Sequence, residues 1–299
     1  MEYRYSGKSG LQLPLISLGL WHNFGSVDPY DNARAMLLRA WEQGITHFDI
    51  ANNYGPEPGS AETTFGRVLR EDLAAHRDEM IISSKAGYLM WNGPYGDGGS
   101  RKYLMASCNQ SLRRTGLDYF DIFYSHRYDP NTPIEETMQA LVDIVHAGKA
   151  LYAGISNYPA DKQQECYDYL RAAHVPCVIS QYKANMLFED TLRNNLSVAE
   201  ENGSGFICFS PLAQGLLTDR YLHGIPEGSR ATKEVFLHRA QITEDVIART
   251  RRLSEIAASR GQSVAQMALA WLLAHEGVTS VIVGASDGRF PPPAFGFLR

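Results

Sequence analysis

Short apolar runs alternate with longer amphipathic stretches along almost the whole chain. Eight short runs have the composition and length of buried strands: residues 15–19, 47–49, 80–85, 119–125, 151–156, 178–181, 206–209 and 281–284. Helical periodicity occupies most of the intervals, over residues 32–43, 61–70, 102–114, 134–147, 161–173, 192–202 and 263–274. This alternation predicts parallel strands joined by crossover helices, which is an α/β fold.

The ends of the predicted helices carry their own signals. A glycine lies within two residues of the end of four of them, and glycine readily adopts the left-handed backbone that stops a helix; these are Gly44, Gly116, Gly148 and Gly203. Ser263, with Gln266 three residues later, forms a capping-box pattern in front of an apolar run. Both observations agree with the predicted βα units.

Eight strands predict a closed (β/α)8 TIM barrel that forms one domain over residues 1–286. The interval from Ser210 to Gly284 is longer than one βα unit, so we expect an extra loop and an extra helix there. Residues 287–299 contain three consecutive prolines, which forbid a regular helix. We therefore expect an irregular Pro-rich tail in place of a normal eighth helix.

The charge balance limits the partners of the protein. Of 299 residues, 28 are basic and 33 acidic, a net charge of −5, and no basic run would attract nucleic acid or an anionic membrane. No apolar leader is visible, and the longest near-apolar stretch, residues 264–274, is too short to cross a bilayer. The four cysteines form no C-x-x-C motif, which is typical of buried thiols in a reducing compartment. We expect a soluble, cytoplasmic protein.

Four residues at or after predicted strand ends could carry chemistry together. Asp49, Lys85 and His126 should converge on one face of a parallel barrel, and Tyr54 follows Asp49 by a short loop. A tyrosine has a pKa near ~10, and a neighbouring lysine would lower it so that the phenol can protonate a carbonyl. Asp49 would hold the lysine ammonium, and His126 would orient the carbonyl oxygen.

Each of these residues also has an ordinary interpretation. A lysine at a strand end is usually solvated, an aspartate there often caps the next helix, and a lone histidine is often satisfied by backbone groups in the barrel wall. The joint pattern is what favours catalysis. The other histidines show no paired ligand spacing, so we expect no metal site.

Several runs of sequence resemble the aldo-keto reductases. Phe48 to Gly55 (FDIANNYG), followed by Ser60-Ala61-Glu62, is similar to the loop that carries the aspartate and tyrosine of that family. The segments that resemble its lysine, histidine and cofactor strands are residues 82–85, 121–126, 154–157, 209–215 and 281–286. The resemblance covers residues 3–286. Through residues 87–103 it extends to the bacterial group that reduces L-glyceraldehyde 3-phosphate, which is related to potassium-channel β-subunits.

The resemblance implies a TIM barrel that binds NADPH. It makes Ser156, Asn157 and Gln181 partners of the nicotinamide carboxamide, and Phe209 the residue that stacks on the nicotinamide ring. The other positions that it assigns to the cofactor are Trp21, Ser210, Leu212, Gln214, Gly215, Arg220, Arg230, Gly284 and Ser286. Arg220 and Arg230 would bind phosphate, with solvated loop charges as the alternative.

Aromatic residues should line the mouth of the barrel and contact a small substrate. Trp21, Tyr88, Trp91 and Tyr95 are candidates, and Arg127 beside His126 could attract a phosphate group. The alternative is that these loop aromatics only pack the loop itself.

The chain also departs from the family pattern at two places. Residues 181–185 (QYKAN) differ from the usual run after that strand. The residues that hold the adenosine 2′-phosphate and adenine in the family are absent after Ser286, so we expect weakened cofactor binding and only a slight preference for NADPH over NADH.

These patterns lead to one main function and two alternatives. The main prediction is an NADPH-dependent reductase of a small aldehyde or ketone, with L-glyceraldehyde 3-phosphate or a methylglyoxal-like compound as substrate. The alternatives are a binding subunit that senses the cofactor with incidental turnover, or a truncated, inactive product. Self-association into a homo-oligomer is left open.

Overall fold

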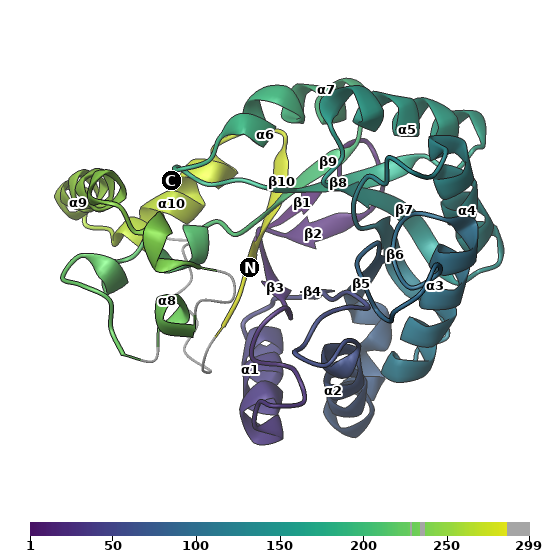
Figure 1. The fold of residues 1–299 in the computed structure, drawn as a ribbon, viewed down its shortest axis with the longest axis horizontal. Helices are drawn as coiled ribbons and strands as arrows, with labels where there is room; N and C mark the ends of the chain where they lie inside the picture. The colour runs from purple at the N-terminus through teal and green to yellow at the C-terminus, as the bar shows by residue number, and fades with distance from the viewer. Residues whose placement is uncertain (228, 234–236, 286–299) are drawn as a thin grey trace.

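The computed structural model describes residues 1–227, 229–233 and 237–285. Eight parallel strands close into a barrel in the order β10-β3-β4-β5-β6-β7-β8-β9, as predicted (Figure 1). The strands are β3 (Ile16–Gly19), β4 (His47–Asp49), β5 (Ile81–Ala86), β6 (Phe120–Ser125), β7 (Ala150–Ser156), β8 (Cys177–Lys183), β9 (Gly205–Phe209) and β10 (Val278–Val283). All eight predicted runs are therefore strands.

Helices surround this barrel, and most occupy the predicted stretches. They are α1 (Tyr30–Glu42), α2 (Ser60–Val68), α3 (Arg101–Thr115), α4 (Ile134–His146), α5 (Ala160–Ala172), α6 (Asp190–Asn194), α7 (Leu196–Glu201) and α10 (Val264–Leu273). The single helix predicted over residues 192–202 is wrong in detail, because a break at Asn195 divides it into α6 and α7. The Asn195 side chain donates to backbone and to Gln163 at this break.

The predicted helix ends are confirmed. Gly44, Gly116, Gly148 and Gly203 all have positive φ, between 68° and 80°. Ser263 accepts a hydrogen bond from the Gln266 backbone, and the Gln266 side chain accepts one from the Ser263 backbone, which completes the capping box. These local signals thus end or begin helices as expected.

The long interval between β9 and β10 holds the extra helix that the sequence predicts. This is α9 (Glu244–Ser259), which precedes α10; short turns at Ala213–Gly215, Asp219–Tyr221 and Arg239–Gln241 and the four-residue α8 (Arg230–Lys233) come before it. In Figure 1 these elements gather on one side of the barrel.

An antiparallel hairpin at the N-terminus is absent from the prediction. It consists of β1 (Tyr3–Tyr5) and β2 (Gln12–Pro14), and it lies against the end of the barrel where the strands begin. The Ser6 hydroxyl donates to the Val178 carbonyl, and the Leu13 side chain is fully buried. These two strands of three residues are partly exposed and lie outside the βα alternation, so no repeat in the chain marks them.

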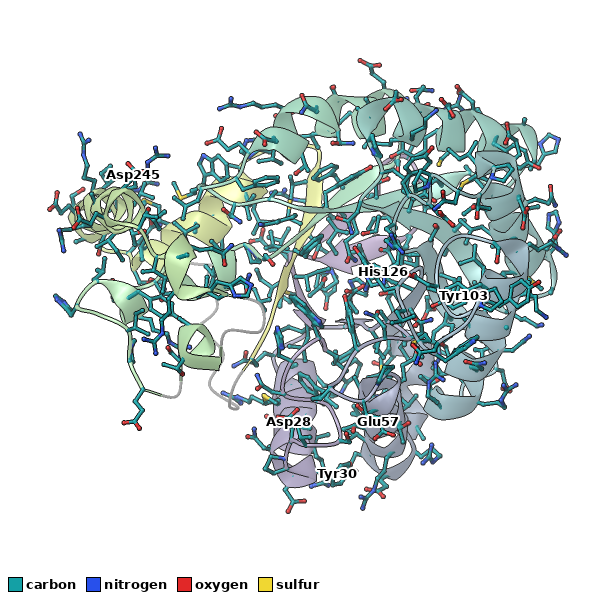
Figure 2. All side chains as sticks on the ribbon, in the orientation of Figure 1. Asp28, Tyr30, Glu57, Tyr103, His126 and Asp245 are labelled. Carbon is teal, nitrogen blue, oxygen red and sulfur yellow. The ribbon has the colours of Figure 1, made fainter. Side chains whose placement is uncertain are left out.

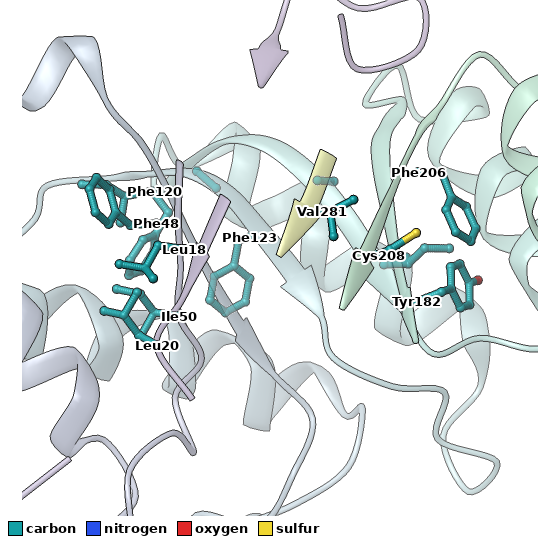
Figure 3. Packing of buried hydrophobic residues seen from close by; sticks show 14 of the residues in the cluster. Leu18, Leu20, Phe48, Ile50, Phe120, Phe123, Tyr182, Phe206, Cys208 and Val281 are labelled. Atoms are coloured by element: carbon teal, nitrogen blue, oxygen red, sulfur yellow. The ribbon is translucent and has the colours of Figure 1, made fainter. Parts of the chain in front are cut away.

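Two layers of buried side chains hold the barrel. Between strands and helices lies the larger layer, which includes Phe48, Phe65 and Phe123, and the stacked rings of Tyr182 and Phe206 belong to it (Figure 3). A smaller cluster of strand residues fills the interior; its members include Ile122, Tyr124, Ile179, Ile207 and Ile282. Alternation along each strand separates the two layers.

The expected tail, residues 287–299, and Ser286 lie outside the described residues, as does the position of an eighth helix. No helix within the part of the chain that the structure describes is long and apolar enough to cross a membrane.

Candidate active site

The barrel brings the four candidate catalytic residues to one end. Asp49 is the last residue of β4, Lys85 lies in β5, and His126 directly follows β6. Tyr54 lies in the loop between β4 and α2, where its backbone N–H donates to the Ala51 carbonyl. Figure 2 shows His126 over the middle of the barrel.

A buried ion pair forms the centre of this group. The Lys85 Nζ donates to Asp49 Oδ2 at 2.6 Å and to the Ile50 carbonyl at 2.7 Å, and both side chains are almost inaccessible to solvent. The same nitrogen lies 4.9 Å from the centroid of the Tyr54 ring. The Tyr54 and His126 rings meet edge to face with centroids 5.8 Å apart. All four side chains therefore lie within one small volume.

Burial dominates the protonation of these groups. The pKa of Tyr54 is raised well above its usual value by burial and by the Asp49 charge. Burial lowers the pKa of Lys85, and it lowers that of His126 well below its usual value. The net lowering of the Tyr54 pKa that we expect from the sequence is therefore not found in the protein alone, where burial and the Asp49 charge both disfavour the phenolate.

The residues assigned to the nicotinamide follow the neighbouring strands β7, β8 and β9. Asn157 donates through its amide to the His126 carbonyl at 3.2 Å and to Ser156 Oγ at 3.0 Å. The Gln181 amide donates to Asp49 Oδ1 at 3.0 Å. Phe209 is half-buried at the end of β9. This sector therefore adjoins the catalytic group through two direct hydrogen bonds.

Aromatic rings flank the opposite side of the group. The Tyr88 ring meets the His126 ring edge to face with centroids 4.6 Å apart, and the Trp21 ring lies 6.4 Å from that of Tyr54. Trp91 packs against Tyr103, and Tyr95 lies beside Lys102. Of the four candidate substrate aromatics, Trp21 and Tyr88 are thus the two whose rings contact the catalytic group.

Arg127 is held by residues of the adjacent loop. Its Nε donates to the Gly87 carbonyl and its Nη2 to Asp97 Oδ1, both at 2.7 Å, and the guanidinium lies over the Tyr88 ring. A side chain expected to meet a substrate phosphate therefore also fastens the loop after β5.

The comparison with known proteins decides the family. Residues 15–288 match the Aldo/keto reductase family. The chain belongs to the aldo-keto reductase family. L-glyceraldehyde 3-phosphate reductase of Escherichia coli (strain K12) is 57% identical over 291 residues, 96% of this chain and 84% of that protein. A probable voltage-gated potassium channel subunit beta of Arabidopsis thaliana is 34% identical over 293 residues, 96% of this chain and 88% of that relative.

As an aldo-keto reductase, the protein is an oxidoreductase that acts on a small molecule with a nicotinamide cofactor. The alternative of a cofactor-sensing subunit is not favoured, because the relative named as a reductase is much more similar than the relative named as a channel subunit.

The backbone of this aldo-keto reductase fits a bound cofactor. Six non-glycine residues among those described have positive φ, and four of them lie in the segments that resemble the family's cofactor site: Asn157, Ser210, Ala213 and Gln214. Such conformations cost of order 1–3 kcal/mol each and are typical of ligand-binding sites. Three of these four residues lie in the turn from Ser210 to Gly215, which therefore concentrates unusual backbone geometry.

Other candidate cofactor residues lie around this turn. Leu212 and Gly215 are half-buried within it, Arg220 is exposed in the next turn, and Gly284 follows β10. Arg230 is the first residue of α8. Ser286 lies outside the described residues.

Three residues near the site were missed from the sequence. The Asn52 amide donates to the Tyr103 hydroxyl at 3.0 Å, and that hydroxyl donates to the Tyr88 carbonyl, which joins the loops after β4 and β5. The third is Asp97, the partner of Arg127. Tyr103 reads as an ordinary helix residue and Asp97 as a loop charge, so no local signal marks either.

Within the described residues, no group of three or more His, Cys, Asp or Glu could hold a metal ion.

Proposed function

We propose that this aldo-keto reductase uses NADPH to reduce a small aldehyde or ketone, with L-glyceraldehyde 3-phosphate or a short methylglyoxal-like compound as substrate and Tyr54 as proton donor. The observation that carries the proposal is the cluster of Tyr54, His126 and the buried Lys85–Asp49 pair. The 57% identity to a protein named L-glyceraldehyde 3-phosphate reductase supports the substrate class.

The protonation of the residues suits reduction. A phenol with a raised pKa keeps its proton at neutral pH, so Tyr54 is ready to donate it to the oxygen of a carbonyl. His126, with its lowered pKa, is neutral and offers one ring N–H to orient the same oxygen. NADPH, when bound, supplies the hydride to the carbonyl carbon. The substrate leaves as the alcohol.

Lys85 contributes a fixed positive charge beside the phenol. As Tyr54 gives up its proton, negative charge develops on its oxygen beside the buried Lys85 ammonium, which stabilises it. Asp49 holds that ammonium in one place at 2.6 Å. The pair thus stabilises the developing phenolate of Tyr54 more than the neutral phenol.

The proposed nicotinamide contacts follow from the hydrogen bonds already made. The amide protons of Asn157 go to Ser156 and the His126 carbonyl, so its carbonyl oxygen is the acceptor that a carboxamide NH₂ needs. Gln181 would bind the same group while it contacts Asp49. Phe209 would stack on the ring, and Ser210 to Gly215 would bind the pyrophosphate.

All four cysteines are free and buried, which supports a reducing compartment, and we place the enzyme in the cytoplasm.

The test is turnover of NADPH, followed by its absorbance, with glyceraldehyde 3-phosphate, glyceraldehyde and methylglyoxal. We expect oxidation of NADPH well above the control without protein. No turnover with any short aldehyde would contradict the proposal. Fluorescence titration with NADPH and NADH tests the cofactor preference separately: strong, selective NADPH binding would contradict the expected slight preference for NADPH over NADH.

A further inference from the structure

A continuous chain of buried polar side chains crosses four adjacent strands beneath the catalytic aspartate. Ser280 Oγ in β10 lies 2.7 Å from Ser17 Oγ in β3, which lies 2.8 Å from His47 Nδ1 in β4. His47 Nε2 lies 3.0 Å from Ser83 Oγ in β5, and that hydroxyl donates to Asp49 Oδ1 at 2.8 Å. All five side chains are buried.

The donors and acceptors of this chain allow one arrangement. A carboxylate only accepts hydrogen bonds, so the single hydroxyl proton of Ser83 goes to Asp49, and Ser83 Oγ must accept from His47 Nε2–H. Burial lowers the pKa of His47 to about 4, so the ring is neutral and Nδ1 carries no proton. Nδ1 then accepts from Ser17, which leaves Ser17 Oγ as the acceptor toward Ser280 at 2.7 Å; Ser280 Oγ also lies 3.4 Å from the Leu15 carbonyl. From Ser17 onward, the proton of each group therefore points toward Asp49.

The position of the chain argues against simple filling of the barrel. Elsewhere the interior holds apolar side chains such as Ile122, Ile179 and Ile207. Replacing such side chains by histidine and serine adds polar groups that are costly unless every one is paired. Here the paired groups lead to the one carboxylate that holds Lys85.

We propose that His47 is a positioning residue for reduction, which acts through Ser83 to hold the Asp49 carboxylate in the orientation that places Lys85 beside Tyr54. The Asp49 carboxylate accepts hydrogen bonds from Lys85 Nζ, Ser83 Oγ and the Gln181 amide. The Lys85 Nζ is also held by the Ile50 carbonyl, and the Ser83 hydroxyl is held by His47 Nε2, which fixes the direction of its proton. The inference rests on the proposed function, since it assigns Asp49 a part in that reaction.

The first test needs no activity. In ¹⁵N-labelled protein, two-bond nitrogen–proton correlations distinguish the two neutral forms of a histidine ring. We expect His47 as the Nε2–H form, without titration between about pH 5 and about pH 8. An Nδ1–H form, or a protonated ring, would overturn the chain, whether or not the protein reduces aldehydes.

The second test compares two serines on one strand. Ser83→Ala removes the donor to Asp49, while Ser84→Ala removes an equally buried hydroxyl that donates to the Glu62 carboxylate at 2.6 Å on the outer side of β5. We expect Ser83→Ala to lower kcat about tenfold, with little change in the KM for NADPH or for the aldehyde. Ser84→Ala should lower the melting temperature but keep kcat. Equal kcat in the two variants would overturn the proposal.

The third test is rescue at His47. Glutamine places its amide nitrogen near Nε2 and keeps the donor to Ser83, whereas asparagine reaches only the Nδ1 position and loses that donor. We expect His47→Gln to retain kcat within about threefold and His47→Asn to fall about tenfold. If kcat falls to a similar extent in both variants, in parallel with their melting temperatures, His47 has only a structural role. If no variant and no wild-type sample reduces any aldehyde, the proposed function fails, and the ring-nitrogen measurement still decides the chain.

Discussion

Tyr54 combines a half-buried phenol with a fixed neighbouring cation, and this pairing gives the sharpest prediction. Tyr54→Phe removes the transferable proton and little else, so kcat should fall about 10²- to 10⁴-fold, while cofactor binding measured by fluorescence stays the same. Tyr182→Phe is the matched control, because its hydroxyl is also buried but donates to the Tyr158 carbonyl away from the site. A Tyr54→Phe enzyme with nearly full kcat would show that Tyr54 is not the proton donor.

Lys85 and Asp49 depend on each other for stability as well as for chemistry. Lys85→Met leaves the Asp49 carboxylate buried without its cation, and breaking such a pair costs about 3–5 kcal/mol. Adding Asp49→Leu removes the stranded charge, so the double variant should recover much of that loss while remaining inactive. Urea unfolding of the single and double variants measures this directly. A double variant no more stable than Lys85→Met would contradict the pairing.

The glycine after α4 provides a test of local backbone geometry. Gly148 has a φ of 68°, and a Cβ there would meet no atom within 4 Å, so Gly148→Ala isolates the cost of the left-handed backbone. We expect a loss of about 1–2 kcal/mol in the free energy of unfolding. Gly10→Ala is the control, since a Cβ at Gly10 also meets nothing and its φ is not in that region. Equal stabilities of the two variants would contradict the assignment.

The loop after β5 and Arg127 form one unit, so Arg127 has to serve both structure and substrate. If its charge attracts a phosphate group, Arg127→Ala should lower the preference for phosphorylated over plain glyceraldehyde about tenfold. Asp97→Asn should raise that preference, because it removes the carboxylate that competes for the guanidinium. The measurement is the ratio of kcat/KM for the two substrates. An unaltered ratio in Arg127→Ala would show that Arg127 holds the loop and does not bind the substrate phosphate.

Acid should destabilise the whole barrel through His47. Its pKa is about 4 in the folded chain and near ~6.5 when unfolded. Between these values the unfolded chain binds a proton that the folded chain does not, so stability falls as pH falls through this window. The loss is on the order of 3 kcal/mol, and above about pH 6.5 this contribution no longer changes.

This pH dependence can be assigned to one residue. The slope of the unfolding free energy against pH counts the protons that the chain takes up on unfolding, and in His47→Gln this number should fall by about one. The exposed-site variant His223→Gln should give the same slope as wild type. Identical curves for His47→Gln and wild type would show that His47 does not titrate in this way.

Much of the architecture follows from local pattern. The eight strand runs, the glycines that end helices and the capping box at Ser263 depend on residues a few positions apart, and all of them are confirmed. The presence of an aspartate, a tyrosine, a lysine and a histidine at strand ends also follows from the chain, because parallel strands of a barrel all end on one face.

Other features depend on contacts between distant residues. The hairpin that closes the bottom of the barrel, the break at Asn195 and the ion pair between Asp97 and Arg127 have no periodic signal of their own. The raised pKa of Tyr54 likewise reflects the burial of its ring, which no neighbour in the chain reveals. These features therefore depend on the tertiary structure. Local sequence, by contrast, determines which elements form, because helix and strand preferences act over short distances.

The buried chain below Asp49 shows where local pattern ends. Ser17, His47, Ser83 and Ser280 are ordinary polar residues in four separate strands. Strand order and register alone bring them within hydrogen-bond distance, because side chains of adjacent strands meet only when the barrel has closed. The sequence therefore predicts the barrel and its candidate catalytic residues, and the folded barrel determines which polar groups hold those residues in place.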